Sequence, residues 1–376
     1  MDATQHTELD GRHLETLVIG AGQAGLATAY HLKQAGRDAL VVDAAHRVGD
    51  GWRQQWDSLR LYSPARFDSL PGLEYGGPRW HFPSKDEFAD YLERYAEELA
   101  LPVRLGTRVL RLRRQDGGDG YEVTTDAGTL TADNVVVATG TFGRTPWVPD
   151  FADQLDPGIV QLHSSQYRNP DQLPDGPVLV VGSSHSGCDI AYELAATRPT
   201  MMAGRDTGEI PVPFTSPLAK VVLPVMLFAM VNIATRTSPI GRKKVQQVRL
   251  HGGGPRLRVQ KADLAERGVD WVLDHVTGVE AGLPVVGDRG PVPVASVVWC
   301  TGFRQDFRWI ELDVFDEHGW PREFKGTVEE APGLFFTGLA FQSAAGSMLV
   351  HGAGRDAGRV VQQILRRSPA TAHVPA

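Results

Sequence analysis

The sequence has few cysteines, no excess of basic charge and no metal-ligand clusters, and each absence argues against a class of protein. Its 376 residues include only two cysteines, Cys188 and Cys300, which form no Cys-x-x-Cys pair. This argues against a dithiol redox centre. The formal net charge is -7, which argues against nucleic acid as a partner, because phosphate binding requires a basic face. We also expect no bound metal.

Apolar segments that could cross a membrane are also lacking. The run PLAKVVLPVMLFAMVNIA, residues 217–234, contains Lys220 and Pro224 and falls short of the ~20 apolar residues that a spanning helix needs. It predicts a buried or lid-like helix that forms a wall of a substrate channel. A peripheral membrane contact is the less favoured alternative. The first fifteen residues are polar and have no apolar signal-peptide core, so we expect a cytoplasmic protein.

A glycine-rich turn follows the apolar run TLVIG near the N-terminus. Gly20, Gly22 and Gly25 complete the pattern G-x-G-x-x-G, a helical segment follows, and a second apolar run ends on Asp43. This order predicts a dinucleotide-binding βαβ unit, in which the glycines allow a tight turn, clearance for the pyrophosphate and close helix packing. The carboxylate of Asp43 suits ribose hydroxyls and repels a 2′-phosphate, so the nucleotide is FAD or NAD.

Residues 47–67 favour FAD over NAD. They are rich in Gly, Trp and Arg, and a flavin ring needs walls and hydrogen-bond donors that a plain NAD site does not. The other residues that we expect to bind a cofactor here are Gln23, Ala24, Gly51, Trp52, Arg60, Val109, Thr139, Gly140, Thr301, Gly302 and Gly338.

A second glycine-rich turn follows the apolar run GPVLVV. It keeps the first and third glycines, has Ser184 in the middle position, and leads to a helix and then a strand predicted to end on Arg205. Because a guanidinium binds a 2′-phosphate, we expect NADPH here. The alternative is a degenerate unit kept for packing. The residues expected at this site are Gly182, Ser183, Ser184, Ser186, Gly187 and Arg205.

Two apolar strands, ADNVVVATG and ASVVWCTGF, end in matching Thr-Gly pairs that bracket the second unit. We therefore predict an α/β fold with two Rossmann-like domains. The FAD-binding domain comprises residues 1–145 and 299–376, and the NADPH-binding domain, residues 146–298, is inserted into it. Near the C-terminus we expect a strand, a loop that Gly338 begins, and a helix whose positive end faces the flavin.

These motifs resemble the class B flavin monooxygenases. The resemblance covers nearly the whole chain and rests on GAGQAG (20–25), DGWRQQWDSLRLYSP (50–64), ATG (138–140), HSSQY (163–167), GSSHSG (182–187) and CTGF (300–303). It implies an FAD- and NADPH-dependent monooxygenase with O₂ as co-substrate. A flavin C4a-hydroperoxide would oxygenate a small, fairly apolar organic molecule at nitrogen, sulfur or carbon.

Because the flavin carries this chemistry, the resemblance demands no acid–base pair. Ser63, near the place of an Asn found in many members, and Gln342 are the candidate catalytic residues. Two alternatives stay open: an NAD(P)H-dependent flavin reductase that passes electrons to a quinone or a protein, and a non-catalytic flavoprotein sensor. The sequence specifies neither the substrate nor the oligomeric state.

Overall fold

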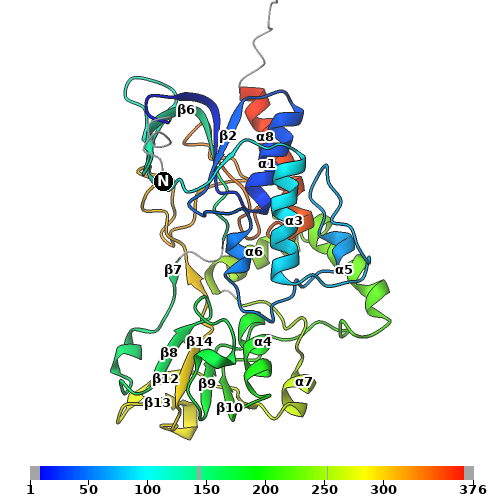
Figure 1. The fold of residues 1–376 in the computed structure, drawn as a ribbon, viewed down its shortest axis with the longest axis vertical. Helices are drawn as coiled ribbons and strands as arrows, with labels where there is room; N and C mark the ends of the chain where they lie inside the picture. Colours follow the sequence, from blue (N-terminus) through cyan, green and yellow to red (C-terminus); the bar gives the residue numbers. More distant parts are fainter. Residues whose placement is uncertain (1–8, 142–144, 252, 368–376) are drawn as a thin grey trace, which may run out of the picture.

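The computed structural model describes residues 9–141, 145–251 and 253–367, which form two stacked units, each built on its own sheet (Figure 1). The larger sheet has the order β3-β2-β1-β6-β5-β4, with β16 also paired to β6. Its β3, β2, β1, β6 and β16 run parallel, and β4 and β5 form an antiparallel hairpin on β6. The strands are β1 (His13–Ile19), β2 (Ala39–Val42), β3 (Val103–Arg104), β4 (Val109–Arg114), β5 (Tyr121–Thr125), β6 (Gly128–Val137) and β16 (Leu334–Phe336).

Three helices, α1 (Gln23–Gln34), α3 (Lys85–Glu98) and α8 (Val350–Arg367), lie side by side on one face of this sheet (Figure 1). Their apolar sides enclose a core that includes Val18, Phe88, Tyr95 and Val360. The parallel strands are covered on both faces, which explains their nearly continuous apolar sequence. Helix α3 begins at a capping box, in which Ser84 accepts from the Glu87 backbone and the Glu87 side chain accepts in return.

The smaller sheet is entirely parallel and has the order β11-β10-β9-β14-β8. The chain enters this unit after β6 and returns from it after β14, and the two crossing segments pair as β7 and β15. The prediction of an α/β fold with two Rossmann-like domains is therefore confirmed. The elements of this smaller unit and of the two crossing segments are β7 (Thr145–Pro146), β8 (Val160–His163), β9 (Val178–Val181), α4 (His185–Leu194), β10 (Thr200–Ala203), α7 (Lys261–Glu266), β11 (Asp270–Val272), β12 (Val276–Glu280), β13 (Leu283–Val286), β14 (Ser296–Trp299) and β15 (Phe303–Arg304).

The apolar run at residues 217–234 forms a surface helix, α5 (Ala219–Asn232), and α6 (Pro239–His251) follows it. One side of α5 is buried and the other is exposed, so the expectation of a buried helix holds for one side only. The end of α5 is fastened to the C-terminal loop, where the Gly346 amide donates to the Met230 carbonyl at 3.1 Å. Across the described part of the chain, none of the helices is both long and apolar enough to span a bilayer.

Candidate functional site

The first glycine turn joins β1 to α1, and its three glycines meet different surroundings. Gly20 has φ +110°, and a Cβ there would lie 2.7 Å from the Ala138 carbonyl oxygen. A Cβ on Gly25 would lie 1.8 Å from the Gly20 oxygen. Gly22 has φ -80° and would meet no atom within 4 Å. Protein packing therefore requires glycine at 20 and 25, whereas Gly22 leaves open space at the start of α1.

Polar groups that can make further hydrogen bonds border this open space. The Asp43 carboxylate, just after β2, accepts from the Ala21 amide at 2.6 Å and from the Ala45 amide at 2.8 Å, which fixes it beside the turn. The backbone nitrogen of Thr139 lies 3.3 Å from the position of a Cβ on Gly20, and its buried Oγ1 has no hydrogen-bond partner among the described residues. The clearance at Gly22, the acid at 43 and this orphaned hydroxyl all fit a dinucleotide such as FAD.

The second turn joins β9 to α4 and repeats this geometry. A Cβ on Gly187 would lie 1.8 Å from the Gly182 oxygen, and one on Gly182 would lie 2.3 Å from the Cys300 oxygen. Ser184 caps α4 with φ -91°, close to the φ of Gly22, so the middle position needs no left-handed backbone. Its hydroxyl donates to the Gly254 carbonyl at 3.1 Å. The serine is thus accommodated in the turn with the same extended backbone that Gly22 has in the first turn.

Arg205 is exposed and lies two residues beyond β10, which ends at Ala203 and not at Arg205 as expected. Gly204, with φ +156°, turns the chain between them. Asp206 and Glu209 follow Arg205 closely, and the buried Arg256 lies 2.7 Å and 3.3 Å from their carboxylates. Arg256 therefore offsets two negative charges that would otherwise oppose a phosphate near Arg205.

The two Thr-Gly pairs lie where the chain passes between the units. Gly140 and Gly302 both have positive φ, 78° and 84°. The hydroxyl of Thr301 donates to the Trp147 carbonyl, and His163 Nε2 lies 3.0 Å from the Gly302 carbonyl. Burial lowers the pKa of His163, and a carbonyl only accepts, so Nε2 carries the proton of a neutral ring. This histidine fastens the crossing and has no evident role in chemistry.

The C-terminal loop packs directly on the first turn. A Cβ on Gly338 would lie 2.8 Å from the Ala24 Cβ, and Gln23 Nε2 donates to the Met348 carbonyl at 3.1 Å. The Gln342 amide donates to the Phe336 carbonyl at 2.9 Å and accepts from the Leu339 amide at 3.3 Å. Because both ends of this buried amide bind the loop itself, Gln342 shapes the loop and is not directed at a ligand.

Ser63, the other catalytic candidate, is buried beside a carboxyl group that sequence reasoning missed. Its Oγ donates to Asp68 Oδ1 at 2.5 Å, and Asp68 Oδ2 has no hydrogen-bond partner among the described residues. Burial raises the pKa of Asp68 to about 7, although the bond from Ser63 opposes this shift. Nearby, the centre of the Phe67 ring lies 6.4 Å from the centre of the His351 ring. The two buried ring nitrogens of His351 have no hydrogen-bond partner among the described residues. Burial lowers the pKa of His351 to about 4.

The remaining residues predicted to bind FAD lie outside the first glycine turn. Gly51 and Trp52 belong to the short helix α2 (Asp50–Arg53). The Trp52 ring packs edge-on against the ring of Phe88, with ring centres 5.0 Å apart. Arg60 donates to the Phe82 carbonyl at 3.2 Å and is held at the start of α3. Val109 begins β4, two residues after Thr107, whose amide donates to the Asp43 carbonyl at 2.8 Å.

A polar cluster between the two units was also missed. The Tyr62 hydroxyl donates to the buried carboxylate of Asp189 in α4 at 3.2 Å, and Arg258 lies 3.1 Å from the same carboxylate. Burial is the main cause that raises the pKa of Asp189. An aspartate on the buried side of a predicted helix is a signal that could have pointed to this contact.

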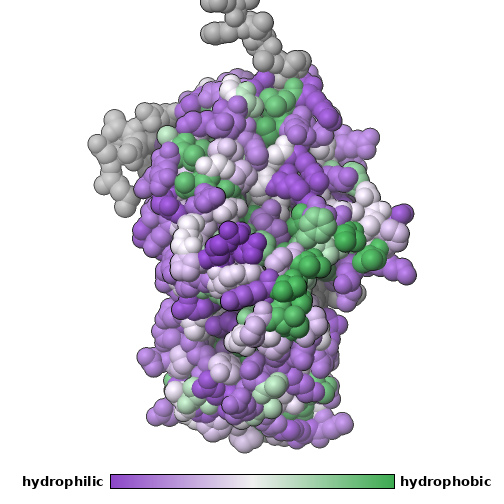
Figure 2. All heavy atoms as spheres, turned by 90° about the vertical axis from the view of Figure 1, so that its right-hand side faces the viewer, coloured by the Kyte–Doolittle hydropathy of each residue, from purple (hydrophilic) through white to green (hydrophobic). Residues whose placement is uncertain are grey.

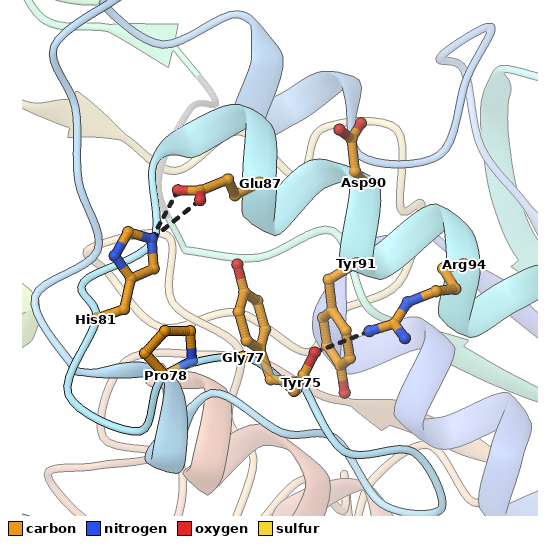
Figure 3. A pocket seen from close by; sticks show the side chains of 9 residues that line it. Tyr75, Gly77, Pro78, His81, Glu87, Asp90, Tyr91 and Arg94 are labelled. Atoms are coloured by element: carbon orange, nitrogen blue, oxygen red, sulfur yellow. Dashed lines mark hydrogen bonds and ion pairs between the residues drawn. The ribbon is translucent and has the colours of Figure 1, made fainter.

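A surface groove of about 410 Å³ lies between residues 75–78 and α3. In Figure 3, His81 points toward Glu87, with Nε2 at 3.0 Å from the carboxylate, and Arg94 Nη2 donates to the Tyr75 carbonyl at 2.8 Å. None of its lining residues belongs to either glycine turn.

Together, the fold and the two turns define an α/β oxidoreductase with two dinucleotide-binding units. Residues 17–220 match the family described as pyridine nucleotide-disulphide oxidoreductase. The chain is 36% identical, over 94% of its length and 98% of the relative's, to an uncharacterized CzcO-like oxidoreductase of Geobacillus kaustophilus. It is 32% identical to the indole-3-pyruvate monooxygenase YUCCA1 of Oryza sativa over 52% of this chain and 49% of the relative.

A solved flavin-containing monooxygenase from Stenotrophomonas maltophilia superimposes with a TM-score of 0.74 at 25% identity, covering 94% of this chain and 99% of that one. The chain therefore belongs to the pyridine nucleotide-disulphide oxidoreductase family, and its similarity to solved flavin monooxygenases is consistent with the resemblance to the class B enzymes. Its two cysteines are both free. Burial raises the pKa of Cys188 to about 12 and also raises that of Cys300, so neither thiol is poised for disulphide chemistry.

Proposed function

We propose that the protein is an NADPH-dependent FAD monooxygenase that oxygenates a small, fairly apolar organic molecule at nitrogen, sulfur or carbon. Residues 1–145 and 299–376 would hold FAD, and residues 146–298 would hold NADPH. The observation that carries this proposal is the repeated turn, in which Gly22 and Ser184 share one backbone conformation. An acid follows the first turn and a base follows the second, so the two sites favour different nucleotides.

The chain's own groups bind and orient the two coenzymes. FAD, when bound, would supply the redox chemistry between NADPH and O₂. The N-termini of α1 and α4 offer amide groups and positive dipole ends to the two pyrophosphates. Asp43 would accept from the ribose of FAD, and Arg205 would pair with the 2′-phosphate of NADPH. The Tyr62–Asp189 and His163–Gly302 contacts hold the units together at the crossing.

The test is a measurement of oxygen transfer from ¹⁸O₂. The purified flavoprotein is incubated with NADPH, ¹⁸O₂ and a panel of probes comprising a thioether, a tertiary amine and a cyclic ketone. We expect one labelled oxygen atom in a product for each NADPH consumed in coupled turnover. NADPH oxidation that is accelerated by a quinone, with no label in any product, would identify a reductase. The absence of NADPH oxidation would identify a sensor.

A further inference from the structure

Helix α5 presents an apolar side that no described part of the chain covers. Ala219, Leu223, Leu227 and Val231 recur every four residues and are buried. The opposite side carries Leu218, Val221, Val225 and Phe228, which are 55–66% exposed. Their spacing of three and four residues places them in one stripe. The helix thus has two opposite apolar sides, of which only one is packed, a pattern that indicates a missing partner.

The exposed apolar side chains are concentrated in this region. Of the nine large hydrophobic side chains most exposed in the described structure, six lie between residues 218 and 240. Figure 2 shows a green, hydrophobic band on the side of the molecule that carries α5, which lies at the right of Figure 1. Ile233 and Ile240, both 55% exposed, extend the stripe through the turn to α6. We call these six side chains, from Leu218 to Ile240, the α5 surface.

The charges around the α5 surface are of one sign. Residues 210–262 contain nine Lys and Arg and no Asp or Glu, in a chain whose net charge is -7. Four of the arginines are paired with acids outside this segment. Lys220, Arg242, Lys243 and Lys244 are exposed and make no ion pair with any described residue. Lys243 and Lys244 lie one helical turn after Ile240, on the same side of α6.

The apolar stripe and the unpaired cations together decide between a second copy of the chain and a lipid membrane as the partner of the α5 surface. In a symmetric contact between two copies, each copy would present its unpaired cations to a neighbour with the same apolar and basic surface. No acid of the segment would be there to pair them. An anionic lipid leaflet supplies both components, an acyl region for the apolar stripe and phosphate groups for the lysines.

We propose that the α5 surface docks the protein peripherally on an anionic phospholipid membrane. The buried side of α5 faces inward, where Leu223 lines a 170 Å³ pocket together with Trp80, Phe82 and Phe214. The helix therefore separates the docking surface from an aromatic pocket and from the C-terminal loop. The proposal goes beyond the enzymatic function and does not depend on which substrate is oxygenated.

The test is cosedimentation of the flavin-loaded protein with two kinds of vesicle, phosphatidylcholine alone and phosphatidylcholine mixed with phosphatidylglycerol. We expect binding to the mixed vesicles that weakens as salt is raised. Lys243→Gln with Lys244→Gln should reduce the affinity on the order of 25-fold, since each lysine near an anionic surface contributes about fivefold. Phe228→Ser should reduce it by roughly tenfold or more, through lost apolar burial.

A matched control is Leu273→Ser, because Leu273 is 58% exposed, similar to the 62% of Phe228, but lies outside the α5 surface. This variant should bind like the wild type, and unchanged flavin absorbance checks the folding of each protein. Equal binding to both kinds of vesicle, or no binding to either, would overturn the proposal. So would a wild-type dimer in solution that Phe228→Ser converts to a monomer, because the surface would then be an interface between copies.

Discussion

Replacing Asp68 by Asn should change how the stability of the protein depends on pH. The side chain of Asp68 is buried, and burial raises its pKa to about 7, against about 3.9 in an unfolded chain. Below about pH 4 the carboxyl is neutral in both states and costs nothing. As the pH rises from about 4 to 7, the unfolded state ionises first, so stability falls. Asn keeps an acceptor for the Ser63 hydroxyl and cannot ionise, so it should remove this loss.

The magnitude follows from the size of the shift. Three pKa units correspond to a maximum penalty of about 4 kcal/mol above pH 7. Between about pH 5 and about pH 8.5 the wild type should lose about 3 kcal/mol relative to Asp68→Asn. For a chain of this length that difference is about 4 °C in melting temperature. The assay is thermal unfolding of both flavin-loaded proteins at the two pH values.

Two controls separate this effect from general changes in charge. Asp153→Asn removes an exposed carboxylate and should leave the pH dependence as it is in the wild type. Ser63→Ala removes the bond that lowers the pKa of Asp68, so the loss of stability should still begin near pH 4 but should extend to higher pH and become larger. A melting-temperature gap between Asp68→Asn and the wild type that is equal at both pH values would refute the assignment of a raised pKa.

Two further predictions concern the nucleotide turns. The alanine of Gly22→Ala has space in the protein, so this variant should fold but lose FAD affinity by at least about tenfold. Gly25→Ala, whose Cβ would lie 1.8 Å from the Gly20 oxygen, should lower the stability of the protein as well. Thermal unfolding and flavin content distinguish the two variants, and full flavin content in Gly22→Ala would count against the pyrophosphate assignment. Arg205→Ala should raise the Kd for NADPH on the order of tenfold or more and leave that for NADH nearly unchanged, as measured by titration, and an equal loss for both nucleotides would contradict its assigned role.

The two turns could be predicted because their glycine spacing encodes close backbone contacts. The glycines at 20, 25, 182 and 187 are all within 3 Å of backbone atoms once a Cβ is added, a requirement that appears directly in the sequence. The same reasoning could not locate Arg256, which reaches Asp206 and Glu209 from about 50 residues away. Pairing at that distance depends on the tertiary fold, for which a single sequence gives no spacing rule.

The burial and hydrogen-bond partners of single polar side chains could not be predicted from the sequence either. Nothing in RLYSPARFD shows that Ser63 donates to a buried Asp68, because burial depends on what α3 and the C-terminal loop place over the segment. The apolar letters of residues 217–234 indicated a helix, but not that only one side of it would be covered. Which side is packed depends on the C-terminal loop, more than 100 residues further along the chain.

Anaerobic titration of the bound flavin with NADPH tests most directly the claim that one chain holds two coenzymes, one reducing the other. The account predicts a purified protein with about one FAD per chain, whose oxidised absorbance is bleached completely by about one equivalent of NADPH. Flavin that stays oxidised in excess NADPH, or a chain that takes up no FAD when it is supplied, would contradict it.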